Sequence, residues 1–435
     1  VAFPVTTDAI PCGRRRLLWL ALIVLSPLAW AAKGEVDSAG KTDFAYRFKA
    51  FALADELPSS DLRHGQLGSS ALDYASDFRF LVRHDVGNWR VVLDHTVMLQ
   101  GGDSVFGGGV DNEQLVVSDA GRWVNLTFDL EEGNRHWALH RSDRLNVQWR
   151  KDDCAVTLGR QAVSWGSGIV FQPLDPFNPF APTTVDRDYK AGDDLLLVEK
   201  LLANGQDLQL LHVVRRDAQG QVTAAASSSA FKWHGYAGNL EFELIGAQHY
   251  DRSFWGLSGR LPLGPGVLRT DIAIREGLPG AGGGRRVLGI VNADVAFPLM
   301  NRMAYLFLEY FHNDFGLDDL PAQGAALPED LREALQRGEV FNLMRDYVAL
   351  GGSYQWHPLL THTATVIANL QDGSRLIQTQ INYDAAQNQS LQLGWVGLVG
   401  DQGDEFAPLV IATDASGPVT VGGGNRLYLR WAIYL

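Results

Sequence analysis

Cysteine and basic residues are both scarce in this 435-residue sequence. Only Cys12 and Cys154 occur, and nothing at catalytic spacing accompanies Cys154, which is expected to be an inert thiol. Lys and Arg number 37 against 50 Asp and Glu, which gives a formal net charge of -13. Because phosphate binding needs concentrated Lys and Arg, this balance argues against a nucleic-acid partner.

Long apolar runs are also lacking, apart from one near the N-terminus. Arg14 to Arg16 precede an apolar run over 17–28, and the small-x-small pattern Ala29-Trp30-Ala31 follows it. We interpret residues 1–31 as an N-terminal extension and signal peptide, cut near Ala31. A membrane anchor is the alternative, but the run is shorter than the roughly twenty apolar residues that span a bilayer. The mature chain, 32–435, then keeps one cysteine and no internal disulfide.

What the sequence has in abundance is strict alternation of apolar and polar residues. In the C-terminal stretch "NRLYLRWAIYL", Leu429 and Trp431 fall on one face of a strand and Arg430 on the other. The same period of two runs through the segments near 88–98, 238–249, 265–276 and 374–384. Several of the polar faces carry charge. An ordinary half-buried sheet would show the same alternation, so the number and order of strands must decide.

Eighteen alternating segments are predicted, each about long enough to cross a bilayer as a tilted strand. They lie near 43–52, 73–84, 88–98, 140–150, 153–163, 192–203, 207–216, 226–235, 238–249, 253–262, 265–276, 285–297, 302–313, 345–356, 359–370, 374–384, 388–399 and 425–435. Short links follow the even strands, and the long connections all follow odd strands. This asymmetry is typical of bacterial outer-membrane proteins. The prediction is an all-β, transmembrane, antiparallel up-and-down β-barrel with long extracellular loops, of about 18 strands, with 16 as the alternative.

No constellation of residues indicates an enzyme. Ser167 has no local feature of a nucleophile, and the eleven histidines are scattered without metal-ligand spacing. We therefore predict no catalytic residues, no metal and no cofactor. In the long connection after residue 313, Pro328 and the acidic pair Glu329 and Asp330 predict the start of a short helix that ends before Gly338.

The connection 164–191 stands apart, because "VFQPLDPFNPFAP" places Pro173, Pro176, Pro179 and Pro182 at every third position. Proline lacks the N–H that strands and helices require, so neither element can hold this stretch. A polyproline II ribbon would place the prolines on one edge and leave Phe177 and Phe180 on an apolar edge. A connection of this length without regular structure is either functional or disordered, and its aromatic content predicts order.

The stretch "LGRQAVSWGSGIVFQPLDPFNPFAP" resembles a signature of porin-like outer-membrane β-barrels of Gram-negative bacteria, a family largely of unknown function, with a looser likeness to alginate-export porins. The residues that carry the resemblance are Gly159, Arg160, Gln161, Trp165, Gly166, Pro173, Asp175, Asn178 and Pro179. The resemblance implies a location in the outer membrane, contact with outer-membrane lipid and lipopolysaccharide, and insertion by the barrel-assembly machinery. Leu435 departs from it, since such barrels commonly end in Phe or Trp.

From these observations we predict a channel for passive or selective passage of a small solute, narrowed by segment 164–191 folded into the lumen. The apolar edge would press on the wall, with Asp175 and Asn178 bordering the passage. The pore and constriction candidates are Arg160, Gln161, Trp165, Asp175, Phe177, Asn178, Phe180, Arg187 and Lys190. An external cap and a role in barrel folding alone are the alternatives for the segment. For the whole chain, the alternative is a non-conducting or plugged envelope barrel that acts with polysaccharide-export or surface partners.

Overall fold

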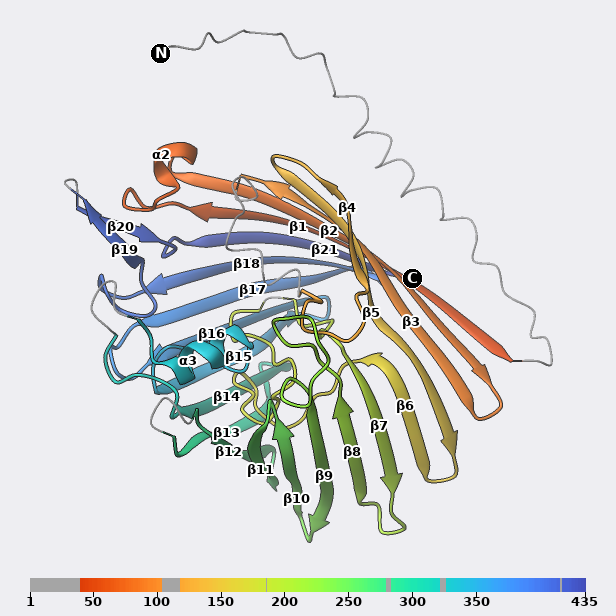
Figure 1. Ribbon diagram of the computed structural model, residues 1–435. Helices are drawn as coiled ribbons and strands as arrows, with labels where there is room; N and C mark the ends of the chain where they lie inside the picture. Colours follow the sequence, from red (N-terminus) through yellow and green to blue (C-terminus); the bar gives the residue numbers. More distant parts are fainter. Residues whose placement is uncertain (1–39, 104–117, 185, 279–282, 321–325, 415–416) are drawn as a thin grey trace, which may run out of the picture.

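The computed structural model describes residues 40–103, 118–184, 186–278, 283–320, 326–414 and 417–435. Its main body is a closed antiparallel β-barrel of eighteen strands (Figure 1). The barrel strands are β1 (Lys41–Glu56), β2 (Ser70–Val86), β3 (Trp89–Gly102), β5 (His136–Lys151), β6 (Cys154–Gln161), β7 (Asp193–Leu201), β8 (Asp207–Val213), β9 (Ser228–Ala237), β10 (Leu240–His249), β11 (Arg252–Leu263), β12 (Gly266–Glu276), β13 (Arg285–Leu299), β14 (Arg302–Asn313), β15 (Asp346–His357), β16 (Leu360–Asn369), β17 (Arg375–Ala386), β18 (Gln389–Val399) and β21 (Arg426–Tyr434).

The barrel closes where the first strand meets the last. Arg47 of β1 is opposite Arg79 of β2 on one side and opposite Tyr434 of β21 on the other. Every other barrel strand pairs with its sequence neighbours, so the topology is up-and-down. Closure leaves no unpaired strand edge, which satisfies the backbone hydrogen bonds of the whole wall. The predicted fold class and eighteen strands are confirmed, and the sixteen-strand alternative is wrong.

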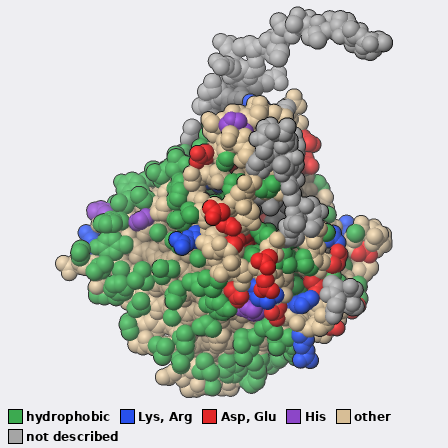
Figure 2. All heavy atoms as spheres, turned by 90° about the vertical axis from the view of Figure 1, so that its left-hand side faces the viewer, with side chains coloured by type: hydrophobic (Ala, Val, Ile, Leu, Met, Phe, Trp, Pro, Cys, Tyr) green, Lys and Arg blue, Asp and Glu red, His purple; other side chains and the backbone are tan. Residues whose placement is uncertain are grey.

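The alternation of the sequence becomes the two faces of the wall. Leu429 and Trp431 of β21 are 48% and 38% exposed on the outer face, whereas Tyr428 and Ala432, which flank this pair in the chain, are 6% and 0% exposed on the inner face. Figure 2 looks toward the end with the long loops; it shows hydrophobic side chains over the wall and Asp and Glu side chains gathered among the loops. An apolar outer face is the surface that a lipid bilayer covers.

Short turns lie at one end of the barrel and the long loops at the other (Figure 1). The predicted loop helix is α3 (Glu329–Gln336). Sequence patterns missed a short helix, α2 (His64–Leu67), and three strands: β4 (Thr127–Glu132), which pairs with β5, and the hairpin of β19 (Leu409–Asp414) and β20 (Gly417–Val421). These strands are only five or six residues long, too short to cross a membrane, and fall inside predicted loops.

No helix in the described ranges is long and apolar enough to cross a membrane. The proposed signal peptide, 1–31, lies outside the residues that the structure describes.

Candidate functional site

Strand β6 leads into segment 164–191, and Arg160 near its end is 1% exposed. Its guanidinium donates to Asp194 on β7 at 2.9 Å and to Asp119, in the connection between β3 and β4, at 2.9 Å. It also donates to the carbonyl of Val124 at 2.5 Å. Burial opposes ionisation of Asp119, but hydrogen bonds from Arg122 and Arg160 outweigh it and lower the pKa of Asp119 to about 2. Arg160 thus fixes the start of the segment to β7 and a neighbouring loop.

The chain turns sharply at Gly166, whose φ of +86° lies in the left-handed region. A Cβ there would lie 2.8 Å from a carboxylate oxygen of Asp271, an inward residue of β12 that is 0% exposed. The next residue, Ser167, donates its backbone N–H and its hydroxyl to that carboxylate, both at 2.7 Å. On β11, Arg260 donates to the carbonyl of Gly166 at 2.8 Å. Glycine is therefore required for this close approach to the wall.

A second inward carboxylate, Glu309 of β14, receives the next turn of the segment. Three consecutive backbone N–H groups donate to it: Ile169 at 2.7 Å, Val170 at 3.0 Å and Phe171 at 2.8 Å. Asn292 of β13 donates from the side at 3.0 Å. Glu309 is 0% exposed, so these four hydrogen bonds compensate for burying its charge. No sequence pattern pairs this residue with the segment.

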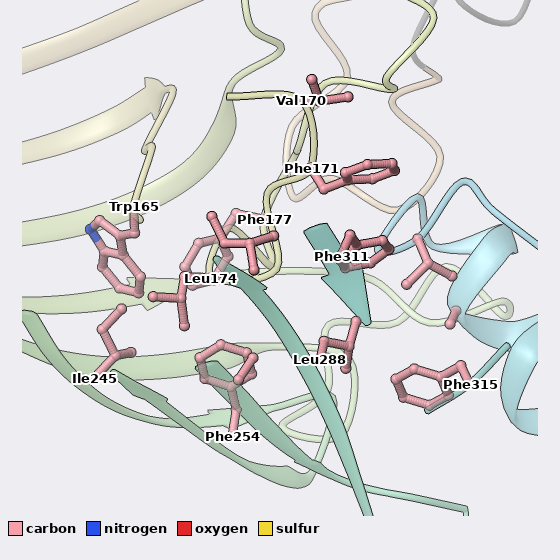
Figure 3. Close-up of a cluster of buried hydrophobic side chains, with 14 of the residues drawn as sticks. Trp165, Val170, Phe171, Leu174, Phe177, Ile245, Phe254, Leu288, Phe311 and Phe315 are labelled. Atoms are coloured by element: carbon pink, nitrogen blue, oxygen red, sulfur yellow. The ribbon is translucent and has the colours of Figure 1, made fainter. Parts of the chain in front are cut away.

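Apolar side chains then pack the segment on the wall (Figure 3). Phe171 stacks on Phe311 of β14 with ring centroids 4.4 Å apart, and Trp165 meets Phe177 edge-on at 5.2 Å. Leu174 is 0% exposed. Burial of large side chains is the main stabilising term in such packing. Phe177, which the sequence places on the apolar edge of the segment, is 5% exposed in this cluster, and Trp165 is likewise 5% exposed.

The segment is not a continuous polyproline II ribbon, which would have no internal hydrogen bonds. The N–H of Asp175 donates to the carbonyl of Gln172 at 3.1 Å, and a second turn joins Thr184 to Ala181 at 2.9 Å. Before the first of these turns, the N–H groups of Ile169, Val170 and Phe171 are bound to Glu309 of the wall, a distant contact that regular proline spacing does not indicate.

Asp175 does not border an open passage, contrary to prediction, because it is 1% exposed and forms an ion pair with Lys190. Burial raises the pKa of Asp175 and lowers the pKa of Lys190, while the charge of each partner opposes the shift. Asn178 donates to Asp193 on β7 at 3.0 Å. The polar edge of the segment is therefore turned toward its own later residues and β7.

The last part of the segment contacts β1, β2 and β21, the strands at which the barrel closes. Lys49 of β1 lies 2.6 Å from Asp186 and 2.8 Å from Asp188. Tyr434 of β21 donates its hydroxyl to Asp188 at 2.7 Å. Tyr189 lies under the guanidinium of Arg79 of β2, 3.6 Å from the ring centroid. The segment thus contacts inward side chains of β10–β14 near its start and of β1, β2 and β21 near its end.

The other candidate residues have separate roles. Arg187 is exposed and donates to the carbonyls of Ile169 and Pro182 at 3.1 and 3.2 Å, so it ties the segment to itself. Phe180 lines a small pocket between the segment and the loop before β15. The side-chain nitrogen of Gln161 is buried, with no hydrogen-bond partner among the described residues.

Part of the inner wall is left uncovered by the segment. The inward residues of β12 to β14 that meet the segment are sealed: Asp271, Asn292 and Glu309 are 0–1% exposed. On β16 and β17, the inward side chains of Thr363 and Gln380 are partly exposed. Inward side chains on β16 and β17 are therefore accessible from the interior of the barrel.

No protein-family model matches the sequence, and comparison with curated proteins gave no significant match. Solved structures do resemble the fold. A BenF-like porin from Pseudomonas fluorescens Pf-5 aligns with a TM-score of 0.53 and 14% identity over 91% of this chain and 99% of that one. Pseudomonas aeruginosa OccK5 (OpdH) aligns with a TM-score of 0.50 and 12% identity over 91% and 98%. The outer membrane protein opdK from Pseudomonas aeruginosa gives 0.50 and 12% over 91% and 98%. At these identities the likeness concerns the fold.

Proposed function

We propose that this chain is a channel in the outer membrane of a Gram-negative bacterium, through which small solutes pass, and that segment 164–191 narrows its lumen. The observation that carries the proposal is the set of contacts made by the segment. Asp271 and Glu309 hold its first part, and Lys49 and Tyr434 hold its last part. A segment fixed at both of these places crosses the lumen and reduces its open area.

The two faces of the wall support a channel. Apolar side chains such as Leu429 and Trp431 would face lipid and lipopolysaccharide, while the inner face carries charged and amide side chains that suit water. One of the similar solved structures is named a porin. The passage would run beside the segment, along the partly exposed inner faces of β16 and β17.

The fixed position of the segment also suits selection among solutes. Its ion pairs and buried hydrogen bonds hold it in one arrangement, so the size of the passage beside it is set by the wall and not by a mobile loop. A rigid constriction discriminates by size and by the groups that line it. The channel is therefore proposed to be selective, with the lining of the uncovered wall as the selecting surface.

Single-channel recording in planar lipid bilayers tests the proposal. The refolded wild-type protein, whose folded state is verified by heat-modifiable migration on a gel, should give discrete current steps. A sample unfolded by heat before addition is the control and should give none. A folded, membrane-inserted protein without current would overturn the channel and favour the plugged barrel that acts with envelope partners.

A further inference from the structure

The uncovered inner wall has a regular chemistry of its own. Inward positions of β16 and β17 alternate with outward apolar residues such as Ile381, which is 44% exposed. In the half of each strand nearer the short turns, these inward positions carry hydroxyl groups on β16 and amide groups on β17, and all six are partly exposed. Nearer the long loops, the inward residues Ile367 and Leu376 are buried. The six partly exposed residues, which we call the hydroxyl–amide ladder, are Thr361, Thr363, Thr365, Gln378, Gln380 and Asn382.

The strand register pairs these residues directly across the two strands. Thr361 is opposite Asn382 and Thr363 is opposite Gln380. Thr365 is opposite Gln378 in the same way. Successive rungs are two residues apart, which is about 6.8 Å along a strand. Three hydroxyl–amide pairs therefore run in steps along the wall, each able to donate and to accept hydrogen bonds.

The ladder begins at the segment. The side-chain amide of Gln378 donates to the carbonyl of Thr183 at 3.1 Å, so the first rung lies at the edge of the segment. The last rung, at Thr361, adjoins the short turn 358–359. The ladder thus covers the distance between the segment and the short-turn end of the barrel.

Most of the hydrogen-bonding capacity of the ladder is unused by the protein. The hydroxyl of Tyr428 donates to Gln380 at 2.8 Å, which leaves the amide N–H groups of Gln380. Thr363 and Asn382 have no side-chain hydrogen bond to any other residue in the described part of the chain. Such groups are available to a molecule inside the barrel.

The ladder also lacks the charges found elsewhere on the inner wall. Around β1 and β2, inward residues form ion pairs such as Lys49 with Asp186 and Arg79 with Asp143. None of the six ladder side chains is ionisable. An uncharged surface with donors and acceptors binds hydroxyl groups through hydrogen bonds and offers little to an ion.

We propose that the hydroxyl–amide ladder is a binding track for hydroxyl-rich solutes, such as sugars and polyols, between the segment and the short-turn end. This inference rests on the proposed channel function. A solute that leaves the constriction exchanges bonds to water for bonds to one rung, and then moves to the next rung. Several weak, equivalent sites favour entry while still permitting release.

Liposome-swelling rates with two neutral solutes of similar size test the track. Mannitol carries a hydroxyl on every carbon, whereas tetraethylene glycol has hydroxyls only at its ends. The test variant is T363V/Q380M, which removes the middle rung with side chains of nearly the same shape. The control is Thr379→Val, which lies on the outward face beside Gln380. Conductance in potassium chloride is recorded for all three proteins.

The quantity compared is the swelling rate with mannitol divided by the swelling rate with tetraethylene glycol. We expect this ratio to be higher for wild type and for the control variant than for the test variant. One hydrogen bond is worth about a 2- to 10-fold change in binding, so the ratio should fall by about that factor. Equal ratios in conducting wild-type and test-variant channels would overturn the ladder and leave the channel intact. Absence of conductance in folded wild type would instead overturn the channel itself.

Discussion

Glu309→Gln should release the first part of segment 164–191 from the wall. One carboxylate oxygen accepts from Val170 and Phe171, and the other accepts from Ile169 and Asn292. Glutamine keeps one acceptor oxygen and places an NH₂ group where the second oxygen was. Two hydrogen bonds are then lost, and the two N–H donors of the protein that bound the second oxygen face the NH₂ group of glutamine.

The size of the effect follows from these contacts. Each hydrogen bond to a buried charged group contributes about 1.5–3 kcal/mol, so two losses amount to about 3–6 kcal/mol. A difference of that size raises the population of a locally open segment by about 10²- to 10⁴-fold. The barrel strands should be unaffected, because local opening does not require the wall to unfold.

Hydrogen exchange of the folded protein in detergent measures this opening at the amides of Ile169, Val170 and Phe171. We expect their protection to fall in Glu309→Gln and to stay at the wild-type level in Glu199→Gln. Glu199 is an inward carboxylate of β7 with no hydrogen bond to the segment among the described residues. Unchanged protection in Glu309→Gln would refute the proposed attachment of the segment.

Three further predictions concern the wall, a loop and the buried ion pair. Leu429→Arg, on the outer face, should cost about 2–4 kcal/mol of stability if the side chain lies near the bilayer midplane, whereas Arg430→Ala should mainly alter conductance. Equal loss of stability in the two variants, measured by urea unfolding, would contradict the assigned faces. Burial raises the pKa of Glu405, in the loop before β19, to about 7 from an ordinary value near 4.5. Glu405 attaches this loop to β15 and β16, because it accepts hydrogen bonds from the hydroxyl of Tyr347 and the amide of Asn369. This attachment should therefore be strongest below pH about 4.5 and weaken as pH rises through about 7, and Glu405→Gln should remove the trend in amide protection factors. Lys190→Met leaves Asp175 buried without its cation, which should destabilise the packed segment by about 3–5 kcal/mol and expose it to protease. The double variant with Asp175→Asn should recover much of the protease resistance.

The barrel could be predicted from the sequence because its wall obeys a local rule. A period of two assigns each side chain to the lipid or the lumen, and Trp431 and Arg430 take their faces from neighbours in the chain. Antiparallel order then follows from short turns between successive strands. Neither inference needs contacts between distant residues.

The site depends on distant contacts, and for that reason it was predicted only in part. The residues that hold the segment, Asp271 and Glu309, are more than 100 positions away from their partners in the chain. Alternation indicates that they point inward but not which backbone amides they meet. Asp175 was misplaced for a similar reason, since its partner Lys190 meets it only after the chain reverses. Arg160 could be singled out by the motif, although its partners Asp119 and Asp194 could not.

If segment 164–191 narrows an open channel, its removal should raise the single-channel conductance. The wild-type protein is compared, in the same bilayer and salt, with a variant in which residues 168–187 are replaced by a short Gly-Ser linker. Both must show heat-modifiable migration before recording. We expect discrete steps for wild type and larger, noisier steps for the variant. Equal steps would contradict a constriction by the segment, and the absence of current in both proteins would contradict the channel.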